Sequence, residues 1–171
     1  MANMCNGSGE HGVTLALGSN LGNRLEMLRR ALAMLRIAGL RQGRRSRVWE
    51  TKPWGVTDQP LFLNMCVEIS TELEPESLLA LLKGVEAELG RGAGRRWGPR
   101  EIDIDIIYYD DLVFNCERLS IPHPRMQERE FVLRPLSECS PEIRHPLLGK
   151  TAAELLEELP EHEDMIWITR I

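Results

Sequence analysis

The sequence predicts an α+β fold, in which an antiparallel sheet has helices packed on one face. Three observations support this prediction. Short segments typical of strands alternate along the chain with segments whose apolar residues recur at helical spacing. The chain has 171 residues, which suits one domain, and its hydrophobic content of 43% is sufficient for a core. The main elements follow in the order β-α-β-β-α-β with C-terminal additions, which is the order of a ferredoxin-like sandwich.

The first predicted unit is a strand, a glycine turn and an amphipathic helix. Apolar residues fill positions 13–17, and leucines recur at helical spacing over 25–35. The turn between them, GSNLGN, could present backbone N–H groups to a phosphate. It matches neither of the two familiar glycine-rich phosphate-binding patterns, so a plain tight turn is the simpler interpretation.

Two further strands are predicted before the middle of the chain. Residues 47–51 and the alternating segment 62–71 read as strands, and we expect them to pair as a hairpin. The loop between them, 52–60, is rich in prolines and is long for a hairpin. It also carries an aromatic residue, Trp54, which favours a lid or a ligand-facing role over simple connection.

The second half of the chain begins with a well-delimited helix. Pro75 opens it, Gly90 closes it, and Glu86 lies on or beside its apolar stripe. A basic loop, GRGAGRRWGPR, then leads into a strand over 102–109. We expect a short strand at 112–114, helices over 130–139 and 151–159, the latter with a capping box, and an edge strand at 166–169.

Composition limits the domain organisation, the compartment and the partners. The small polar residues 1–12 predict a mobile leader, and 13–171 a single domain. The sequence has no secretory segment, no apolar run of about 20 residues and no zinc or redox motif among its four cysteines. We therefore expect a cytoplasmic monomer that binds no membrane. A net charge of −5 argues against general binding of nucleic acid.

The strand after the basic loop begins with alternating isoleucines and aspartates. Successive side chains leave a strand on opposite faces, so three isoleucines face one way and Asp103 and Asp105 face the other. The two carboxylates are then about 7 Å apart along the strand, which suits one or two divalent cations held between them. The same alternation is also typical of the solvated face of a half-buried strand.

Arginines are concentrated on both sides of this strand. Two groups of four lie just before it and after it: Arg91, Arg95, Arg96 and Arg100, then Arg118, Arg125, Arg129 and Arg134. In an acidic protein such clusters favour a small polyanionic ligand, although scattered solvated arginines would also account for them. Together with the aspartates they outline a polyphosphate and magnesium site, because Mg²⁺ prefers hard oxygen ligands and substrate phosphates.

Five segments of the chain form an ordered set of motifs. They are LALGSNLGNR (15–24), ETKPWG (50–55), DQPLFLN (58–64), RRWGPREIDIDI (95–106) and IPHPRMQEREFVLRPL (121–136). From residue 13 to about 150, the chain resembles the 6-hydroxymethyl-7,8-dihydropterin pyrophosphokinase family in these motifs. The resemblance implies a ferredoxin-like α/β sandwich. It also implies transfer of a pyrophosphoryl group from ATP to the hydroxymethyl group of the pterin, with release of AMP, on the route to folate.

The resemblance further implies roles for individual residues. Asp103 and Asp105 would bind two Mg²⁺ ions, with ATP as co-substrate, and would be catalytic together with Arg91 and Arg100. The nucleotide and its phosphates would contact Glu86, Arg91, Arg100, Ile106, Arg118, Ser120, His123 and Arg129. The pterin would lie among Thr51, Pro53, Gly55, Phe62, Asn64, Trp97 and Phe131. Within that slot, Phe62 and Phe131 would cover the two ring faces and Asn64 would bind the edge.

Physical chemistry supports this slot independently. A flat heterocycle offers two π-faces and an edge of donors and acceptors, which suits aromatic walls and a neighbouring amide. Asparagine is disfavoured in the middle of a strand, so Asn64 indicates a hydrogen-bonding partner. From the residues alone, Phe62 and Phe131 could equally be core, Trp97 a hydrophobic plug, and His123 a turn residue between two prolines.

Three departures from the family pattern concern details of the site. Pro124 stands where some members carry an aromatic residue, Ser120 where threonine is found, and the loop after Gly90 is shorter than in some relatives. They leave open which arginine of 91–96 closes over the phosphates, with Arg95 as one candidate. Two other functions also fit the residues: a metabolite-binding module of this fold, and a magnesium-dependent nucleotidyl or phosphoryl transferase with another acceptor.

Overall fold

The computed structural model describes residues 9–92, 98–162 and 164–171. Within these ranges the centre of the molecule is a six-stranded antiparallel sheet formed by β1 (His11–Ser19), β2 (Arg41–Arg45), β3 (Val48–Thr51), β4 (Phe62–Thr71), β5 (Asp103–Tyr109) and β8 (Ile166–Thr169). The strands lie in the order β5-β1-β4-β3-β8, and β2 also pairs with β4. A small hairpin contains β6 (Phe114–Asn115) and β7 (Ser120–Ile121).

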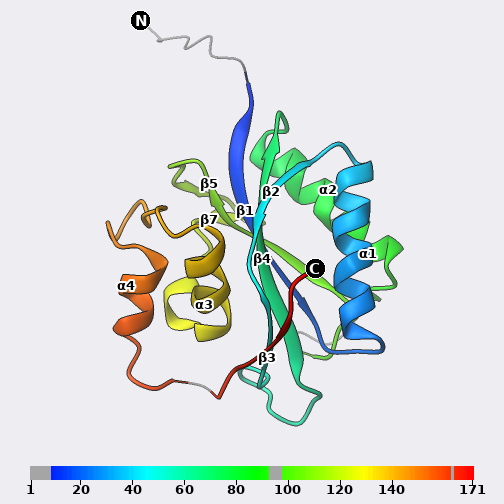
Figure 1. The fold of residues 1–171 in the computed structure, drawn as a ribbon. Helices are drawn as coiled ribbons and strands as arrows, with labels where there is room; N and C mark the ends of the chain where they lie inside the picture. Colours follow the sequence, from blue (N-terminus) through cyan, green and yellow to red (C-terminus); the bar gives the residue numbers. More distant parts are fainter. Residues whose placement is uncertain (1–8, 93–97, 163) are drawn as a thin grey trace, which may run out of the picture.

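Helices cover both faces of the sheet (Figure 1). On one face lie α1 (Arg24–Ile37) and α2 (Pro75–Glu88), and on the other lie α3 (Glu130–Cys139) and α4 (Ala152–Glu157), with the short 3₁₀ helix η1 (Met126–Glu128) before α3. The expectation of helices on one face only is therefore corrected. Cys66, Ile107 and Tyr108 make the second face of the sheet apolar, and the apolar side of α3 buries them.

Local sequence signals set the ends of the helices. Asn23 caps α1, because its side-chain oxygen accepts a hydrogen bond from the backbone N–H of Glu26 at 3.2 Å. Pro75 occupies the first turn of α2, where its missing N–H has no cost. Thr151 and Glu154 form the predicted capping box at the start of α4. These signals are local, which explains why the sequence locates the helices well.

The strands confirm the main predictions and add two elements. β3 and β4 pair as the expected hairpin, and β8 lies at the edge of the sheet as expected. The strands β2 and β7 were not predicted. The β2 sequence RQGRR has neither alternation nor β-branched residues, and it is extended because it pairs with the long strand β4. The short strand expected at 112–114 is found two residues later, at 114–115.

The sheet begins slightly earlier than the expected end of the leader. His11 and Gly12 are already part of β1, opposite Thr71 and Ser70 of β4. Asp110 anchors both of them. Its carboxylate lies 2.7 Å from Nδ1 of His11 and accepts a hydrogen bond from the backbone N–H of Gly12 at 2.8 Å. Among the described helices, none combines the length and the hydropathy that crossing a bilayer would require.

Candidate functional site

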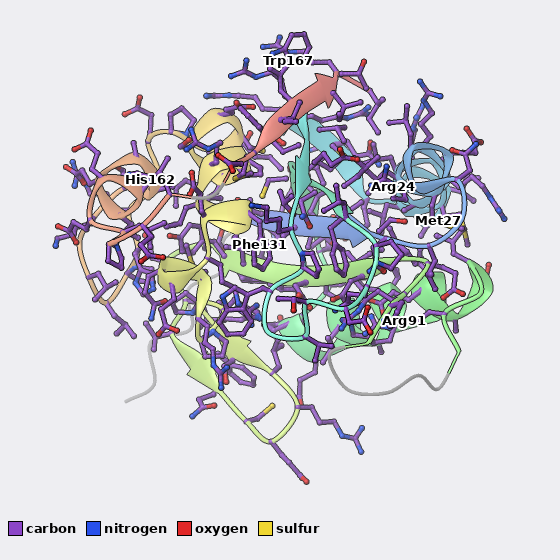
Figure 2. The ribbon with its side chains drawn as sticks, turned by 90° about the horizontal axis from the view of Figure 1, so that it is seen from below. Arg24, Met27, Arg91, Phe131, His162 and Trp167 are labelled. Atoms are coloured by element: carbon purple, nitrogen blue, oxygen red, sulfur yellow. The ribbon has the colours of Figure 1, made fainter. Side chains whose placement is uncertain are left out.

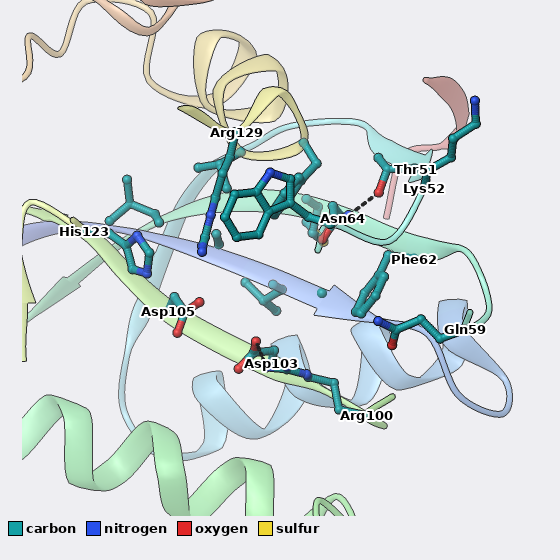
Figure 3. A pocket seen from close by; sticks show the side chains of 18 residues that line it. Thr51, Lys52, Gln59, Phe62, Asn64, Arg100, Asp103, Asp105, His123 and Arg129 are labelled. Carbon is teal, nitrogen blue, oxygen red and sulfur yellow. Dashed lines mark hydrogen bonds and ion pairs between the residues drawn. The ribbon is translucent and has the colours of Figure 1, made fainter. Parts of the chain in front are cut away.

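A pocket opens where the ends of four strands meet (Figure 3). The strands are antiparallel, so the ends of β1 and β3 lie beside the beginnings of β4 and β5. Gly18 of β1 pairs with Asp103 of β5 on one side and with Asn64 of β4 on the other. At the next strand, Thr51 of β3 pairs with Phe62 of β4. The register of the sheet therefore brings predicted metal ligands and predicted pterin contacts into one row.

Asp103 and Asp105 both face this pocket (Figure 3). The isoleucines that alternate with them, including Ile104 and Ile106, are buried in the core under α1 and α2. This arrangement confirms the alternation predicted from the sequence. It also rules out the alternative of a solvated strand face, because both carboxylates line a concave site.

Asp103 is held by two arginines. Its Oδ1 accepts a hydrogen bond from Nη1 of Arg91 at 2.6 Å, and its Oδ2 accepts one from Arg100. Burial, the largest single effect, favours the neutral acid, but the charges of Arg100, Arg91 and Lys83 act against it and together lower the pKa of Asp103. Asp103 is therefore ionised at neutral pH, and its charge is partly neutralised by its neighbours.

Asp105 has the opposite electrostatic environment. Burial raises the pKa of Asp105, and the negative charge of Asp103 raises it further, against the smaller effects of His123, Lys83 and Arg129. The negative charge of Asp105 therefore lies beside that of Asp103 and is the less well compensated of the two. A bound cation would relieve this charge.

Glu86 and Arg91 support the aspartates from behind. Glu86 lies on α2, is only 2% exposed, and accepts hydrogen bonds from the backbone N–H of Ile104 at 2.7 Å and from Nζ of Lys83 at 2.8 Å. Nη1 of Arg91 lies 2.5 Å from the Glu86 carboxylate and also contacts Asp103. Burial raises the pKa of Glu86, and Lys83 acts against this rise. Glu86 thus fixes Arg91 and β5 relative to one another.

The opposite wall of the pocket contains the predicted amide. Asn64 is 7% exposed, and its Nδ2 donates a hydrogen bond to Oγ1 of Thr51 at 2.7 Å (Figure 3). This bond confirms that the mid-strand asparagine has a hydrogen-bonding partner. Because the amide nitrogen is directed to β3, the amide oxygen lies over Gly18, where an added Cβ would be only 2.8 Å away.

Aromatic and basic side chains close the pocket on the α3 side. Phe62 from β4 and Phe131 from the first turn of α3 line it and are only partly buried, and Phe131 also packs against the apolar cluster on the second face of the sheet. The guanidinium carbon of Arg129 lies 4.7 Å from the ring centre of Trp54 and 5.7 Å from that of Phe131. The loop 52–60 is thus attached to α3 through a cation–π contact over the site.

His123 lies on the same side of the pocket, close to Asp105 (Figure 3). Its backbone N–H donates a hydrogen bond to the carbonyl of Ile107 at 3.1 Å, which fixes the loop against β5. Burial lowers the pKa of His123, although the charge of Asp105 acts in the opposite direction. The imidazole is therefore neutral at pH 7 and can exchange hydrogen bonds without adding charge.

Comparison with known proteins identifies the family. Residues 14–141 match the family model described as 7,8-dihydro-6-hydroxymethylpterin-pyrophosphokinase (HPPK). The chain belongs to the HPPK family. A 2-amino-4-hydroxy-6-hydroxymethyldihydropteridine pyrophosphokinase from Methylorubrum extorquens is 46% identical over 146 residues, which cover 85% of this chain and 91% of that protein.

Other HPPK relatives are longer than this chain. The folic acid synthesis protein fol1 of Pneumocystis carinii is 42% identical over 151 residues, which cover 88% of this chain but only 20% of that protein's length. A crystal structure of Plasmodium falciparum HPPK-DHPS with pteroate matches with a TM-score of 0.71 at 17% identity, over 87% of this chain and 42% of that chain. This structural similarity supports the same fold.

Most residues that the HPPK resemblance singled out meet at this site. The pocket is lined by nine of them: Thr51, Phe62, Asn64, Arg100, Asp103, Asp105, His123, Arg129 and Phe131. Glu86 and Arg91 lie directly behind it through their contacts with β5 and Asp103. Residues far apart in the sequence are thus brought together by the sheet register and by the packing of α2 and α3 against it.

The remaining expected residues lie elsewhere. Pro53 and Gly55 belong to the loop beside Trp54 but do not line the pocket, and the side chain of Ile106 is buried on the opposite face of the sheet. Arg118 is exposed, and Ser120 donates a hydrogen bond to Asn115 in the β6–β7 hairpin. Trp97 lies outside the described residues, as do the other arginines of the basic loop, Arg95 and Arg96.

Several lining residues were not predicted as site residues. They are Ala16, Leu17, Gly18, Lys52, Trp54, Gln59, Met65, Ile107 and Val132. For Trp54 a signal existed, because an aromatic side chain in a long loop favours a ligand-facing role. The small and apolar residues of β1 carry no such signal in the sequence. They line the pocket because β1 passes between β4 and β5.

Replacing Asp103 with asparagine tests the electrostatic support of the site. We expect Asp103→Asn to lower the free energy of unfolding by about 1–3 kcal/mol, because it leaves Arg91 and Arg100 without their shared carboxylate. Urea denaturation without divalent cations would measure this. The control Asp111→Asn, at an exposed acid after β5, should stay within about 0.5 kcal/mol of the wild type. Equal stability of the two variants would contradict the prediction.

Proposed function

We propose that this chain transfers a pyrophosphoryl group from ATP to the hydroxymethyl group of 6-hydroxymethyl-7,8-dihydropterin. The products would be AMP and the pterin pyrophosphate, in folate biosynthesis. Membership of the HPPK family supports this activity. The observation that carries the proposal is the row across the sheet, in which the two carboxylates of β5 are separated by the single strand β1 from the buried amide of β4 and its aromatic neighbour.

The chemistry of the donor set fits magnesium. Asp103 and Asp105 offer hard oxygen ligands on one face, and the raised pKa of Asp105 reflects a negative charge that a cation would stabilise. Within the described ranges, no group of three or more acidic, histidine or cysteine side chains is placed to hold a metal. This fits Mg²⁺, which commonly takes one or two carboxylates and completes its coordination with phosphates and water. Two Mg²⁺ ions there would neutralise the phosphates and stabilise the attacking and leaving oxygens.

Arg91 and Arg100 would serve the polyphosphate. In this structure both pair with Asp103. When ATP and the cations are bound, the aspartate would contact the cations and the two guanidinium groups would donate to phosphate oxygens instead. His123, which is neutral and lies near Asp105, would donate to the nucleotide without changing the charge of the site. Glu86 would act as a positioning residue, because it holds Arg91 and contacts the strand that carries the aspartates.

The pterin would occupy the wall opposite the aspartates. Phe62 and Phe131 would cover the two faces of its ring, and the amide of Asn64 would bind its edge. Thr51 would keep that amide in one orientation through the hydrogen bond to Nδ2. The hydroxymethyl group would then point towards β5. Attack by a primary alcohol in this geometry depends on in-line placement and charge neutralisation more than on a strong base.

We also propose that the first six predicted elements form a ferredoxin-like unit. The strands β1, β3, β4 and β5 are antiparallel neighbours in the order β5-β1-β4-β3, and both intervening helices pack on one face. The third layer, α3 with α4, is added to this unit and contributes Phe131 to the pocket.

Product analysis tests the proposed reaction directly. The chain would be incubated with ATP, Mg²⁺ and the reduced pterin, and the nucleotides and pterins would be separated by chromatography. We expect AMP and pterin pyrophosphate in equal amounts, and neither product when Mg²⁺ is chelated. Release of ADP or free pyrophosphate would instead indicate a transferase with another reaction, and no turnover of ATP would indicate a binding module.

Substitution of Gly18 tests the row across the sheet. In Gly18→Ala the new Cβ would lie 2.8 Å from Oδ1 of Asn64 and 3.7 Å from Cδ1 of Phe62, so the amide must move. We expect the KM for the pterin to rise about tenfold and the KM for ATP to stay unchanged. A tenfold effect is smaller than the hundredfold loss of activity that a misplacement of about 1 Å can cause, because the amide can move by less than that. Gly12→Ala is the matched control on β1, since its Cβ would meet only Asp110 at 3.5 Å. The same pterin KM in both variants would argue against the proposed slot.

A further inference from the structure

The loop 52–60 contains an aromatic residue to which the proposed reaction assigns no role. Trp54 stands between Pro53 and Gly55 in the motif ETKPWG. The ring of Pro53 fixes its own φ, and Gly55 has a φ of 85°, in the left-handed region that favours glycine. Pro53 is buried, and Trp54 is half-buried and lines the pocket. The backbone on both sides of Trp54 is therefore restricted, and its indole ring is held at the pocket.

Two arginines lie over the indole ring of Trp54. The guanidinium carbon of Arg129 is 4.7 Å from the ring centre, and that of Arg125 is 5.8 Å from it. Arg129 also lies over the ring of Phe131, at 5.7 Å. Within about 6 Å the face of an aromatic ring attracts a cation. Because a stacked guanidinium keeps its in-plane N–H donors, such a contact is compatible with binding of a phosphate group by the same side chain.

Burial makes this support important for Arg129. Its residue is only 8% exposed, and Figure 3 shows its side chain reaching from the start of α3 towards His123 and Asp105. Burial lowers the pKa of Arg129, the charge of Asp105 acts against this effect, and the charge of Arg125 lowers the pKa further. Removal of a cation from water is costly, and an aromatic face compensates part of that cost. Trp54 therefore stabilises the charged guanidinium inside the pocket.

We propose that Trp54 is the positioning residue for Arg129, and that it holds the guanidinium group in the place where it binds a phosphate group of the nucleotide. A residue of the loop 52–60, whose other predicted contacts are with the pterin, would thus act on nucleotide binding before any pterin is present. Arg125 adds a second positive charge over the same ring, and two like charges held together favour an anion beside them. The inference rests on the proposed function and extends it.

Replacement of the indole tests the positioning role. Leucine keeps an apolar side chain but has no π-face, so we expect Trp54→Leu to bind a non-hydrolysable ATP analogue with Mg²⁺ about tenfold more weakly than the wild type. Trp54→Phe keeps an aromatic face and should stay within about threefold of the wild type. Calorimetry without pterin would measure both affinities. Unchanged affinity in Trp54→Leu, or equal losses in the two variants, would overturn the proposal.

A double-mutant cycle tests whether Trp54 acts through Arg129. Arg129→Met removes the charge and keeps a long side chain. In this background Trp54→Leu should weaken nucleotide binding by no more than about twofold, because the group that Trp54 positions is gone. A further loss of about tenfold would overturn the proposal. The same cycle is measured on the midpoints of urea unfolding without nucleotide, so that a very low affinity of Arg129→Met does not prevent the test. Strictly additive shifts of the midpoint would also overturn the proposal.

The matched control is a second tryptophan that contacts an arginine. The guanidinium carbon of Arg47 lies 6.0 Å from the ring centre of Trp167, and Figure 2 shows Trp167 at the outer rim of the molecule, away from Phe131 of the pocket. Trp167→Leu removes the same kind of contact outside the pocket and should leave the nucleotide affinity within about twofold of the wild type. A loss equal to that of Trp54→Leu would overturn the proposal.

The outcomes separate this inference from the proposed reaction. Unchanged nucleotide affinity in Trp54→Leu, together with formation of AMP by the wild type, would contradict the inference alone. Nucleotide binding that depends on Trp54 and Arg129, without formation of AMP, would support the inference and contradict the proposed reaction. A wild type that binds no ATP analogue would overturn both.

Discussion

Asp105→Asn is expected to reduce the rate of AMP formation at least about a thousandfold. The substitution keeps the size of the side chain but removes the carboxylate that the proposed cations would contact. Charge stabilisation by a bound metal is worth several kcal/mol in the transition state, and each 1.36 kcal/mol corresponds to a factor of ten in rate. Measurement of AMP release at saturating ATP and pterin would test this. A rate within tenfold of the wild type would remove Asp105 from the proposed reaction centre.

The same substitution should not weaken the fold. Burial and the charge of Asp103 raise the pKa of Asp105. An acid whose pKa is raised in the folded state adds stability at low pH that is lost as the pH rises through that pKa, so ionised Asp105 opposes folding at neutral pH. Asparagine carries no charge, and we expect the free energy of unfolding without magnesium to rise by about 0.5–2 kcal/mol. Asp103→Asn should change stability in the opposite direction, so the two neighbouring aspartates are internal controls for each other.

Asn64→Leu is expected to reduce kcat/KM for the pterin at least about a hundredfold. Leucine has a similar size, but it offers no donor or acceptor to the pterin edge and leaves Oγ1 of Thr51 without its partner. Each buried polar group left unpaired costs about 1–3 kcal/mol. A site that can no longer pair the polar groups of its ligand therefore binds and converts that ligand much less efficiently.

A second substitution and a second ligand separate this effect from general damage. Thr51→Val removes only the group that orients the Asn64 amide, so its loss should be about tenfold. The affinity for a non-hydrolysable ATP analogue with magnesium, measured by calorimetry, should stay unchanged in both variants. If Asn64→Leu weakened nucleotide binding as much as pterin binding, the assignment of this wall to the pterin would be wrong.

The sequence predicted those features that depend on local or periodic signals. The alternation at 102–106 predicted that Asp103 and Asp105 lie on the same face of the strand. The capping box predicted the start of α4, and the mid-strand asparagine at position 64 correctly indicated a hydrogen-bonding partner. Each of these depends on the geometry of one element or one pair of strands. Such geometry is set by residues that are adjacent in the sequence or opposite each other in a hairpin.

The features that the sequence did not predict depend on packing between distant segments. The strand β2 exists because β4 is long enough to pair with it, and α3 forms a third layer because the second face of the sheet is apolar. The contact of Arg129 with Trp54 joins a loop and a helix about 75 positions apart in the chain. The different charge environments of Asp103 and Asp105 likewise arise only when Arg91 and Arg100 fold back onto β5. Periodicity cannot indicate such contacts.

The passage of β1 between the aspartates and the asparagine has a consequence for the acceptor. Asp103 and Asn64 both pair with Gly18, so their Cα atoms are separated by two strand spacings, about 10 Å in total. Backbone hydrogen bonds fix this distance, and no side chain can adjust it. The sheet would therefore fix the distance between the edge of the bound pterin and the phosphates. An acceptor with a longer arm between ring and hydroxyl would not fit this separation even if its ring bound equally well.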